Sequence, residues 1–526
     1  MNYALVSRSL GHILLLLAGA MLFSLPWAHP ALGWRGHLDF RPTDFEWAGF
    51  RGLLASSLVS IVVGSTLTIL GRGASGQKLF RKEAMATVGL SWILATLLGA
   101  LPYVLSNTKL ADGTPMTLID ACFEAQSGFS TTGATVLGDL NDPELVPHCI
   151  LFWRSSTHFL GGLGIVVLLV AILGQGAGGK AMMRAEITGP NKDSAFSRMQ
   201  KTASVFATIY VLLNVVLAIL YGLLGMSPFD AICHAFGTMA TGGFSTYNAS
   251  LGHFQSPAIE YLTIVFMVAA GTNFGLLLAV ASGQWRRLVE DVEWKVYVGI
   301  IASVTCFIVG FGLYSENFDS LASACRNGLF QVVSVITTTG YGTDDFDQWN
   351  NFGRGVLFVL MFVGGCAGST GGGMKVIRHV LFAKILRLEL ELSYRPKVVR
   401  PLKMGSTIMD DAEFRKHILV YFGMIGAIFA YGWLFLITVE PDAQWLPATQ
   451  AASSENLLDH KLLDCASAIA ATLHNIGPGL GVVGPTANYA NFAPWSKLLF
   501  VFLMMLGRLE IFSVLVLFVP AFWRKI

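Results

Sequence analysis

The sequence predicts an all-α polytopic membrane protein, and three observations lead to this prediction: the composition, the recurrence of long apolar segments and a repeated turn motif. Of the 526 residues, 54% are hydrophobic and only 13% are charged, whereas soluble domains carry roughly a quarter charged residues. The mean hydropathy is +0.60. The net charge of +2 does not indicate a nucleic-acid partner, because the basic residues are spread among short loops.

Ten apolar segments are near the ~20 residues that a spanning helix requires. They lie at about 9–27, 50–70, 86–105, 150–173, 203–225, 257–281, 297–314, 355–390, 417–438 and 497–520. The eighth segment is interrupted in its middle. The first could instead be the apolar core of a signal peptide, but its length and the early start of the second segment favour a retained helix.

Lysine and arginine in the connections predict the orientation of these spans. Basic residues gather in the connections at 72–82, 180–201, 286–295 and 378–416 and in the last three residues. The alternate connections hold few, such as Arg35, Arg41, Lys109 and Arg326. Because the two sets alternate as ten spans require, both termini are predicted to be cytoplasmic.

The connections after the third, fifth, seventh and ninth segments share a short semi-apolar stretch that ends in a glycine-containing turn. They read "DACFEAQSGFSTTGATV", "DAICHAFGTMATGGFST", "CRNGLFQVVSVITTTGYGTDD" and "DCASAIAATLHNIGPGLG". Three of the four have an acidic residue that opens the short helix and can cap it, namely Asp120, Asp230 and Asp464. A fourfold repeat suggests four similar units around one axis, each with a short helix that does not span.

These turns are candidate ion-binding sites. Irregular backbone at membrane depth must be buried in protein or line a watery path, and its carbonyl oxygens can replace an ion's hydration shell. "TTTGYG" is similar to the "TVGYG" filter of potassium channels. The predicted filter residues are Thr131, Thr132, Gly133, Ala240, Thr241, Gly242, Thr338, Thr339, Gly340, Asn475, Ile476 and Gly477. Glycine-rich surface turns would explain one copy, but not four copies on the same side.

The interrupted eighth segment, "VLFVLMFVGGCAGSTGGGMKVIRHVLFAKIL", is a candidate gate. Glycine is costly inside a helix, so the helix should unwind below the filter. The alternative is a passive kink where helices pack closely through small residues. The predicted gate residues are Gly365, Gly368, Ser369, Thr370, Gly371, Gly372, Gly373, Lys375 and Arg508.

Arg508 lies inside the apolar stretch "LLFVFLMMLGRLEIFSVLVLF", where a charge usually faces a cavity. A guanidinium facing the pore would repel cations, and it could also hold the gate by donating hydrogen bonds to exposed carbonyls. The alternative is a structural ion pair with Glu510 or Glu124.

Enzymatic and metal sites are not expected. Seven cysteines lack metal-ligand spacing, and neither HExxH nor GxSxG occurs. His234 and His474 adjoin the turns, not a candidate nucleophile. Potassium at the filter is the one ion expected, with no organic cofactor.

The stretches "SGFSTTGATV", "ATGGFST", "TTTGYGT", "HNIGPGLG", "GCAGSTGGGMK" and "MLGRLEIFSVLVLF" resemble the Trk-type potassium-uptake proteins, within the group that includes the Ktr and plant high-affinity transporters. The resemblance implies four helix–pore-helix–helix units with four re-entrant pore helices around one ion pore. It further implies a potassium-conducting subunit with a gate in the broken span. It also implies a homodimer on a cytosolic, TrkA-like ring of nucleotide-binding regulatory subunits. Glycine in all four turns implies selection of potassium over sodium.

Five regions follow from this resemblance: an extra two-helix region at 1–82 and four pore repeats at 83–180, 181–290, 291–400 and 401–526. The chain is expected in the lipid of a bacterial inner membrane, with the loops 174–202 and 391–416 as the docking surface for regulators. The alternative function is a potassium symporter coupled to protons or sodium. Scarce acidic residues in the central spans favour a channel.

Overall fold

We describe the protein from a computed structural model, in which residues 1–33, 45–74, 80–164, 199–396, 403–404, 407–408, 412–442, 445, 454–509 and 511–524 are described. The expected docking loop at 174–202 is described only from residue 199 onward. In the loop at 391–416, residues 397–402, 405–406 and 409–411 lie outside the described residues, as does Glu510.

The described residues form a helical protein with one small pair of strands, β1 (Lys403–Met404) and β2 (Thr407–Ile408). The first helices are α1 (Tyr3–Ser24), α2 (Pro30–Gly33), α3 (Trp47–Leu70), α4 (Arg81–Leu105), α5 (Leu118–Phe129), α6 (His148–Leu163), α9 (Met199–Leu223), α10 (Pro228–Met239), α11 (Pro257–Ala270), α12 (Phe274–Ala281) and α13 (Arg286–Glu290). The later ones are α14 (Val292–Tyr314), α15 (Leu321–Ile336), α16 (Asn351–Leu360), α17 (Val376–Tyr394), α18 (Ala412–Val439), α19 (Ser454–Leu473), α20 (Pro494–Arg508), α21 (Phe512–Leu515) and α22 (Pro520–Trp523).

Among the described helices, α1, α3, α4, α9, α14 and α18 are each long and apolar enough to cross a membrane, and two bent helix pairs bring the total to as many as eight. All ten predicted segments coincide at least in part with a helix. The count of ten spans stays a prediction.

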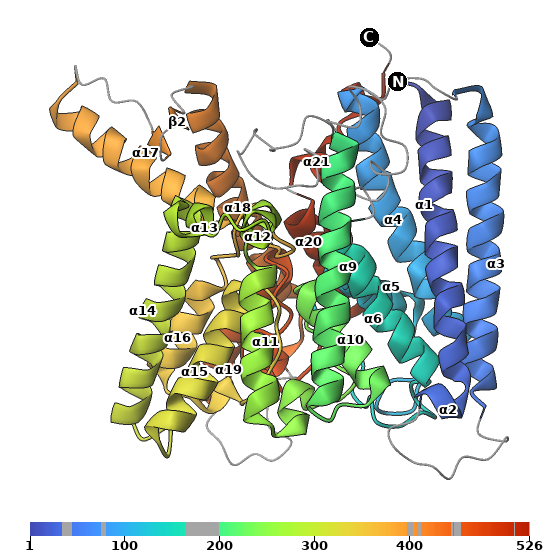
Figure 1. The fold of residues 1–526 in the computed structure, drawn as a ribbon, viewed down its shortest axis with the longest axis horizontal. Coiled ribbons are helices and arrows are strands. Elements are labelled where there is room, and N and C mark those ends of the chain that lie inside the picture. The colour runs from blue at the N-terminus through green and yellow to red at the C-terminus, as the bar shows by residue number, and fades with distance from the viewer. Residues whose placement is uncertain are drawn as a thin grey trace.

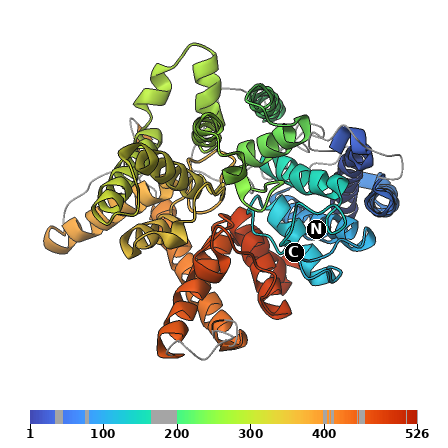
Figure 2. The same ribbon diagram turned by 90° about the horizontal axis from the view of Figure 1, so that it is seen from below.

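Four of the long helices form an outer layer around short, buried ones, whereas the apolar windows of α1 and α4 are 50% and 61% buried. In α18, α9, α14 and α3 only 17% to 28% of the apolar window is buried, as expected of helices that face lipid. By contrast, α5 is buried at every residue from Asp120 to Phe129. The long helices run roughly parallel (Figure 1), and successive parts of the chain surround a common centre (Figure 2).

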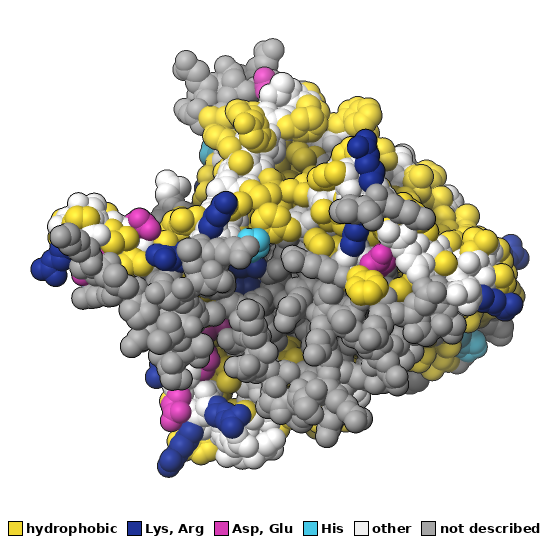
Figure 3. Space-filling view, turned by 90° about the horizontal axis from the view of Figure 1, so that it is seen from above, with side chains coloured by type: hydrophobic (Ala, Val, Ile, Leu, Met, Phe, Trp, Pro, Cys, Tyr) yellow, Lys and Arg dark blue, Asp and Glu magenta, His cyan; other side chains and the backbone are white. Residues whose placement is uncertain are grey.

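Both termini lie at the upper end of the long helices in Figure 1. The described part of this face carries lysine and arginine side chains among hydrophobic ones (Figure 3). This distribution is compatible with the predicted cytoplasmic termini, which stay a prediction.

Two of the predicted acidic residues lie in the first turn of a short helix, and the third does not. Asp120 forms a capping box with the N-cap residue Thr117 of α5. In α10 the N-cap residue is Ser227, whose side chain accepts the Asp230 backbone N–H. The sequence prediction is wrong for Asp464, because α19 begins ten residues earlier, at Ser454. There the carboxylate accepts hydrogen bonds from Trp445 Nε1 (3.0 Å) and from a later backbone N–H.

A second span is broken besides the predicted one. α16 and α17 are separated by residues 361–375, and we call residues 364–375 the glycine loop. The segment 257–281 was expected to be a continuous span, but α11 and α12 meet at 107°. Asn273 explains the break, because its side chain caps α12 by accepting the Gly275 N–H at 2.7 Å.

Candidate ion pathway

The four short helices α5, α10, α15 and α19 end in the same way. Each ends in a Schellman-type turn, in which a backbone N–H beyond the helix bonds to a carbonyl five residues earlier. The bonds run from Thr132 N to Ser127 O (2.9 Å), Gly242 N to Gly237 O (2.8 Å), Thr339 N to Ser334 O (2.9 Å) and Ile476 N to Ala471 O (2.8 Å). We call residues 131–133, 241–243, 338–340 and 475–477 turns 1 to 4.

Each turn places a non-glycine residue in the left-handed region. The φ angles are 52° at Thr131, 55° at Thr241, 58° at Thr338 and 57° at Asn475. A β-branched residue is a genuine outlier there, and such strain costs on the order of 1–3 kcal/mol per residue. Three strained threonines at equivalent positions indicate that the surrounding structure fixes these turns for a function.

The four turns contact one another in a closed ring. The third residue of each turn is a glycine that packs tightly against the next turn. A Cβ on this glycine would lie less than 3.0 Å from a carbonyl oxygen of that turn. The pairs are Gly133 with Gly242 O, Gly243 with Thr339 O, Gly340 with Ile476 O, and Gly477 with Thr132 O. The four oxygens come from the middle residue of each turn. The arrangement therefore brings four equivalent main-chain carbonyls together around one centre.

The ring changes the alignment of turn 2. Sequence reasoning aligned Ala240, Thr241 and Gly242 with the other turns, but Ala240 is the C-cap residue of α10, in the right-handed region. The left-handed glycine of this turn is Gly243, with φ of 75°. The predicted alignment is therefore displaced by one residue, and Gly243 replaces Ala240 among the candidate filter residues.

A cavity opens on the glycine side of the ring. All four left-handed glycines, Gly133, Gly243, Gly340 and Gly477, line it. Gly242, in contrast, does not line this cavity and packs against the ring of His158. The cavity thus supports the revised alignment of turn 2.

A buried ion pair anchors the backbone that follows turns 1 and 2. Glu124 Oε1 and Arg154 Nε lie 2.6 Å apart, and their side chains are 0% and 3% exposed. Glu124 also accepts the Val136 N–H at 3.0 Å, and Arg154 donates to Ser245 O at 2.9 Å. The pair therefore ties two neighbouring turns to the helices α5 and α6.

We expect Arg154→Ala to lower the free energy of unfolding by about 3 kcal/mol, because it leaves the Glu124 carboxylate buried without its partner. Thermal unfolding in detergent measures this loss. Arg326→Ala is the control, because Arg326 is 32% exposed in its pair with Glu260 and such pairs contribute at most about 1 kcal/mol. Equal losses in the two variants would contradict the anchoring role.

The glycine loop packs against residues of the ring that do not line this cavity. Gly372 N donates to Thr338 Oγ1 of turn 3 at 2.7 Å. A Cβ on Gly372 would lie 2.6 Å from Asn475 Cβ of turn 4, and one on Gly373 would lie 3.0 Å from His474 O. The loop therefore lies directly against turns 3 and 4.

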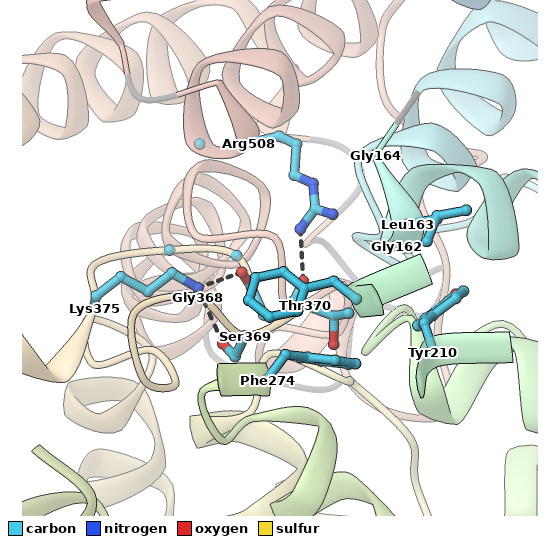
Figure 4. Close-up of a pocket in the computed structure, with 15 residues that line it drawn as sticks. Gly162, Leu163, Gly164, Tyr210, Phe274, Gly368, Ser369, Thr370, Lys375 and Arg508 are labelled. Carbon is cyan, nitrogen blue, oxygen red and sulfur yellow. Dashed lines mark hydrogen bonds between the residues drawn. The ribbon is translucent and has the colours of Figure 1, made fainter. Parts of the chain in front are cut away.

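Arg508 and Lys375 both bind loop carbonyls. Arg508 donates to Thr370 O at 2.6 Å (Figure 4) and to Gly161 O of α6, also at 2.6 Å. Lys375 donates to Gly371 O and, at 3.5 Å, to Ser369 Oγ. The cavity in Figure 4 is lined by both side chains and by Gly368 to Gly373. Of the two sequence alternatives, Glu124 pairs with Arg154, and Glu510 is outside the described residues.

Sequence reasoning missed Gly243, Arg154 and Tyr341. The arginine had a usable signal, since it lies within the apolar run "ILFWRSSTHFLGG" and a charge in such a run has a partner or a cavity. Tyr341 donates to His234 O at 3.1 Å and so packs turn 3 against α10.

Comparisons with known proteins identify relatives of the chain. Residues 53–525 match the family model TrkH, described as a cation transport protein. The chain is similar to the Trk system potassium uptake protein TrkH of Salmonella typhimurium strain LT2 (36% identity, covering 100% of both chains). It is also similar to the protein of that name from Escherichia coli K12 (35% identity, covering 100% of both).

A solved structure is also similar over the whole chain. It is the crystal structure of the potassium transporter TrkH from Vibrio parahaemolyticus, which matches with a TM-score of 0.82 and 31% identity and covers 100% of both chains.

Proposed function

The chain belongs to the TrkH family of cation transport proteins, and on that premise we propose that it is the potassium-conducting membrane subunit of a Trk-type uptake system. It is a transporter and not an enzyme. Family membership and the apolar helices make it a multi-pass protein of the bacterial inner membrane. Potassium is its cargo, as the names of its relatives indicate for those proteins.

In this proposal the ring of turns 1 to 4 serves as the potassium filter. The observation that supports this role is the set of four carbonyl oxygens contributed by Thr132, Gly242, Thr339 and Ile476. Main-chain carbonyls can replace the hydration shell of potassium. The C-terminal ends of four helices meet at the same place, and their partial negative charge favours a cation.

The glycine loop serves as the gate. Its contacts with turns 3 and 4 and the bonds from Arg508 and Lys375 put it beside the ring, where a change of conformation would alter the ion path. The positive charges of Arg508 and Lys375 would also repel a potassium ion and so limit how deeply it enters below the ring.

The remaining parts of the proposal rest on the sequence pattern and on the family resemblance. The apolar segments and the basic connections support ten spans and cytoplasmic termini. The resemblance supports four re-entrant pore helices, five regions with the predicted boundaries, a homodimer and regulation by a cytosolic, TrkA-like nucleotide-binding ring.

Flux through reconstituted vesicles tests the proposal. We expect potassium and rubidium to pass far faster than sodium and lithium, and the current to reverse at the potassium equilibrium potential at any pH and sodium concentration. Equal flux of sodium and potassium would contradict the filter.

A reversal potential that shifts with pH or sodium would instead indicate a symporter. Among the described residues that line the two cavities, the charged ones are Arg154, Lys375 and Arg508. A coupled carrier usually buries acidic groups along its path, so this lining favours the channel.

A further inference from the structure

The entry and the exit of the glycine loop are joined by backbone hydrogen bonds, and we call residues 364–367 and 374–377 the neck of the loop. Gly364 N donates to Met374 O at 2.7 Å, and Val376 N donates to Gly365 O at 3.2 Å. These two bonds bring the entry and exit of the loop together. An acceptor that binds both sides of this neck would therefore fix the position of the whole loop.

Glu293, near the start of α14, is such an acceptor. Its Oε1 atom accepts the Ala367 N–H at 2.8 Å and the Ile377 N–H at 3.0 Å. The first N–H lies on the entry side of the loop and the second on the exit side. Glu293 is 4% exposed, and buried bonds to a carboxylate are roughly twice as strong as neutral ones.

The break between α11 and α12 holds the entry side from the opposite direction. Asn273 Nδ2 donates to Ala367 O at 2.7 Å, and Phe274 N donates to Gly368 O at 3.0 Å. Ala367 thus has its N–H bound by Glu293 and its carbonyl bound by Asn273.

Asn273 and Glu293 are the two ends of one short connection. Between them lie α12 and α13, which form a hairpin at the upper end of α14 in Figure 1. Residues 280–287 of this hairpin are exposed. The residues at the two ends of this hairpin, Asn273 and Glu293, therefore both bind the glycine loop.

We propose that Glu293 and Asn273 are positioning residues of the gate, which tie the neck of the glycine loop to both ends of the α12–α13 hairpin. This inference rests on the proposed function of the glycine loop. Loss of either residue frees the neck without touching the ring, so the gate opens more often while the selectivity stays that of the intact filter.

Glu293→Ala in the full-length protein tests this role in two independent ways. Basal rubidium flux into vesicles is expected to rise about tenfold, since both bonds to the carboxylate are lost. Amide hydrogen exchange of the peptide covering 364–377 is expected to become faster. Exchange does not depend on ion conduction, so it reports on the clamp even if the wild type carries no potassium.

Three variants make the test specific. Glu293→Gln keeps a neutral acceptor oxygen and should give flux and exchange between those of wild type and alanine. Asn273→Ala should speed exchange in the same peptide. Glu290→Ala removes the same charge from the exposed end of α13 and should change neither readout.

Unchanged exchange at 364–377 in a folded Glu293→Ala protein would overturn the proposal. So would a rise in flux that Glu290→Ala reproduces, or a loss of potassium over sodium selectivity in Glu293→Ala, since that would place the defect in the ring. A wild type that conducts no potassium while the exchange results hold would refute the proposed function and leave the clamp intact.

Discussion

Replacing Arg508 with alanine is expected to raise basal potassium flux at least about tenfold. The guanidinium bridges Thr370 O of the glycine loop to Gly161 O of α6, each at 2.6 Å. Each bond from a charged group contributes about 1.5–3 kcal/mol, and about 1.4 kcal/mol changes an equilibrium constant tenfold. Rubidium uptake into vesicles at a fixed membrane potential measures the effect.

Arg508→Lys separates the two roles of this side chain. Lysine keeps the positive charge, but its compact ammonium group cannot reproduce the planar guanidinium that bridges the two carbonyls. If the bridge controls the gate, Arg508→Lys will behave like Arg508→Ala; if repulsion controls it, the lysine variant will behave like wild type. Unchanged or lower flux in folded Arg508→Ala protein would refute both roles.

Gly340→Ser is expected to lower the potassium-to-sodium permeability ratio by roughly tenfold or more, a loss of about 1.4 kcal/mol or more of discrimination. Gly340 has φ of 77°, and a Cβ there would lie less than 3.0 Å from Ile476 O and 2.9 Å from Pro478 Cδ. The carbonyl of Ile476 must move to make room, so one of the four oxygens leaves its position. Bi-ionic reversal potentials measure the ratio.

Gly342→Ser is the matched control for this substitution. Gly342 lies two residues further along the same segment, and the nearest atom to a Cβ there is Pro485 Cβ at 3.6 Å, an ordinary contact. It should therefore lose far less discrimination than Gly340→Ser. Intact selectivity in folded Gly340→Ser protein would mean that turn 3 is not part of the filter.

The turns could be found from the sequence because their residues recur, but their geometry could not. Threonine prefers extended backbone, so nothing local predicts left-handed Thr131, Thr241 and Thr338. The two adjacent glycines of "ATGGF" allow two alignments, and the structure distinguishes them by the left-handed φ of Gly243 and its contact with Thr339 O.

Some of the residues that hold the turns and the glycine loop could be found from the sequence, and others could not. Arg154 and Glu124 were each visible as a charge in an apolar setting, but 30 residues separate them, and their pairing depends on how α5 packs against α6. The break at Asn273 had a local signal, because "GTNFG" combines glycines with a good N-cap residue. The bonds of Glu293 to both sides of the loop had none.

The interlocking of the four turns has a consequence for biosynthesis. Turn 4 contributes Gly477, which packs against Thr132 O of turn 1. On a growing chain, turn 1 leaves the ribosome hundreds of residues before the partner that completes its surroundings. Its strained threonine then has no neighbour on that side to hold it. Completion of the ring of turns is therefore a late event, which has to wait until the C-terminal quarter of the chain has been made.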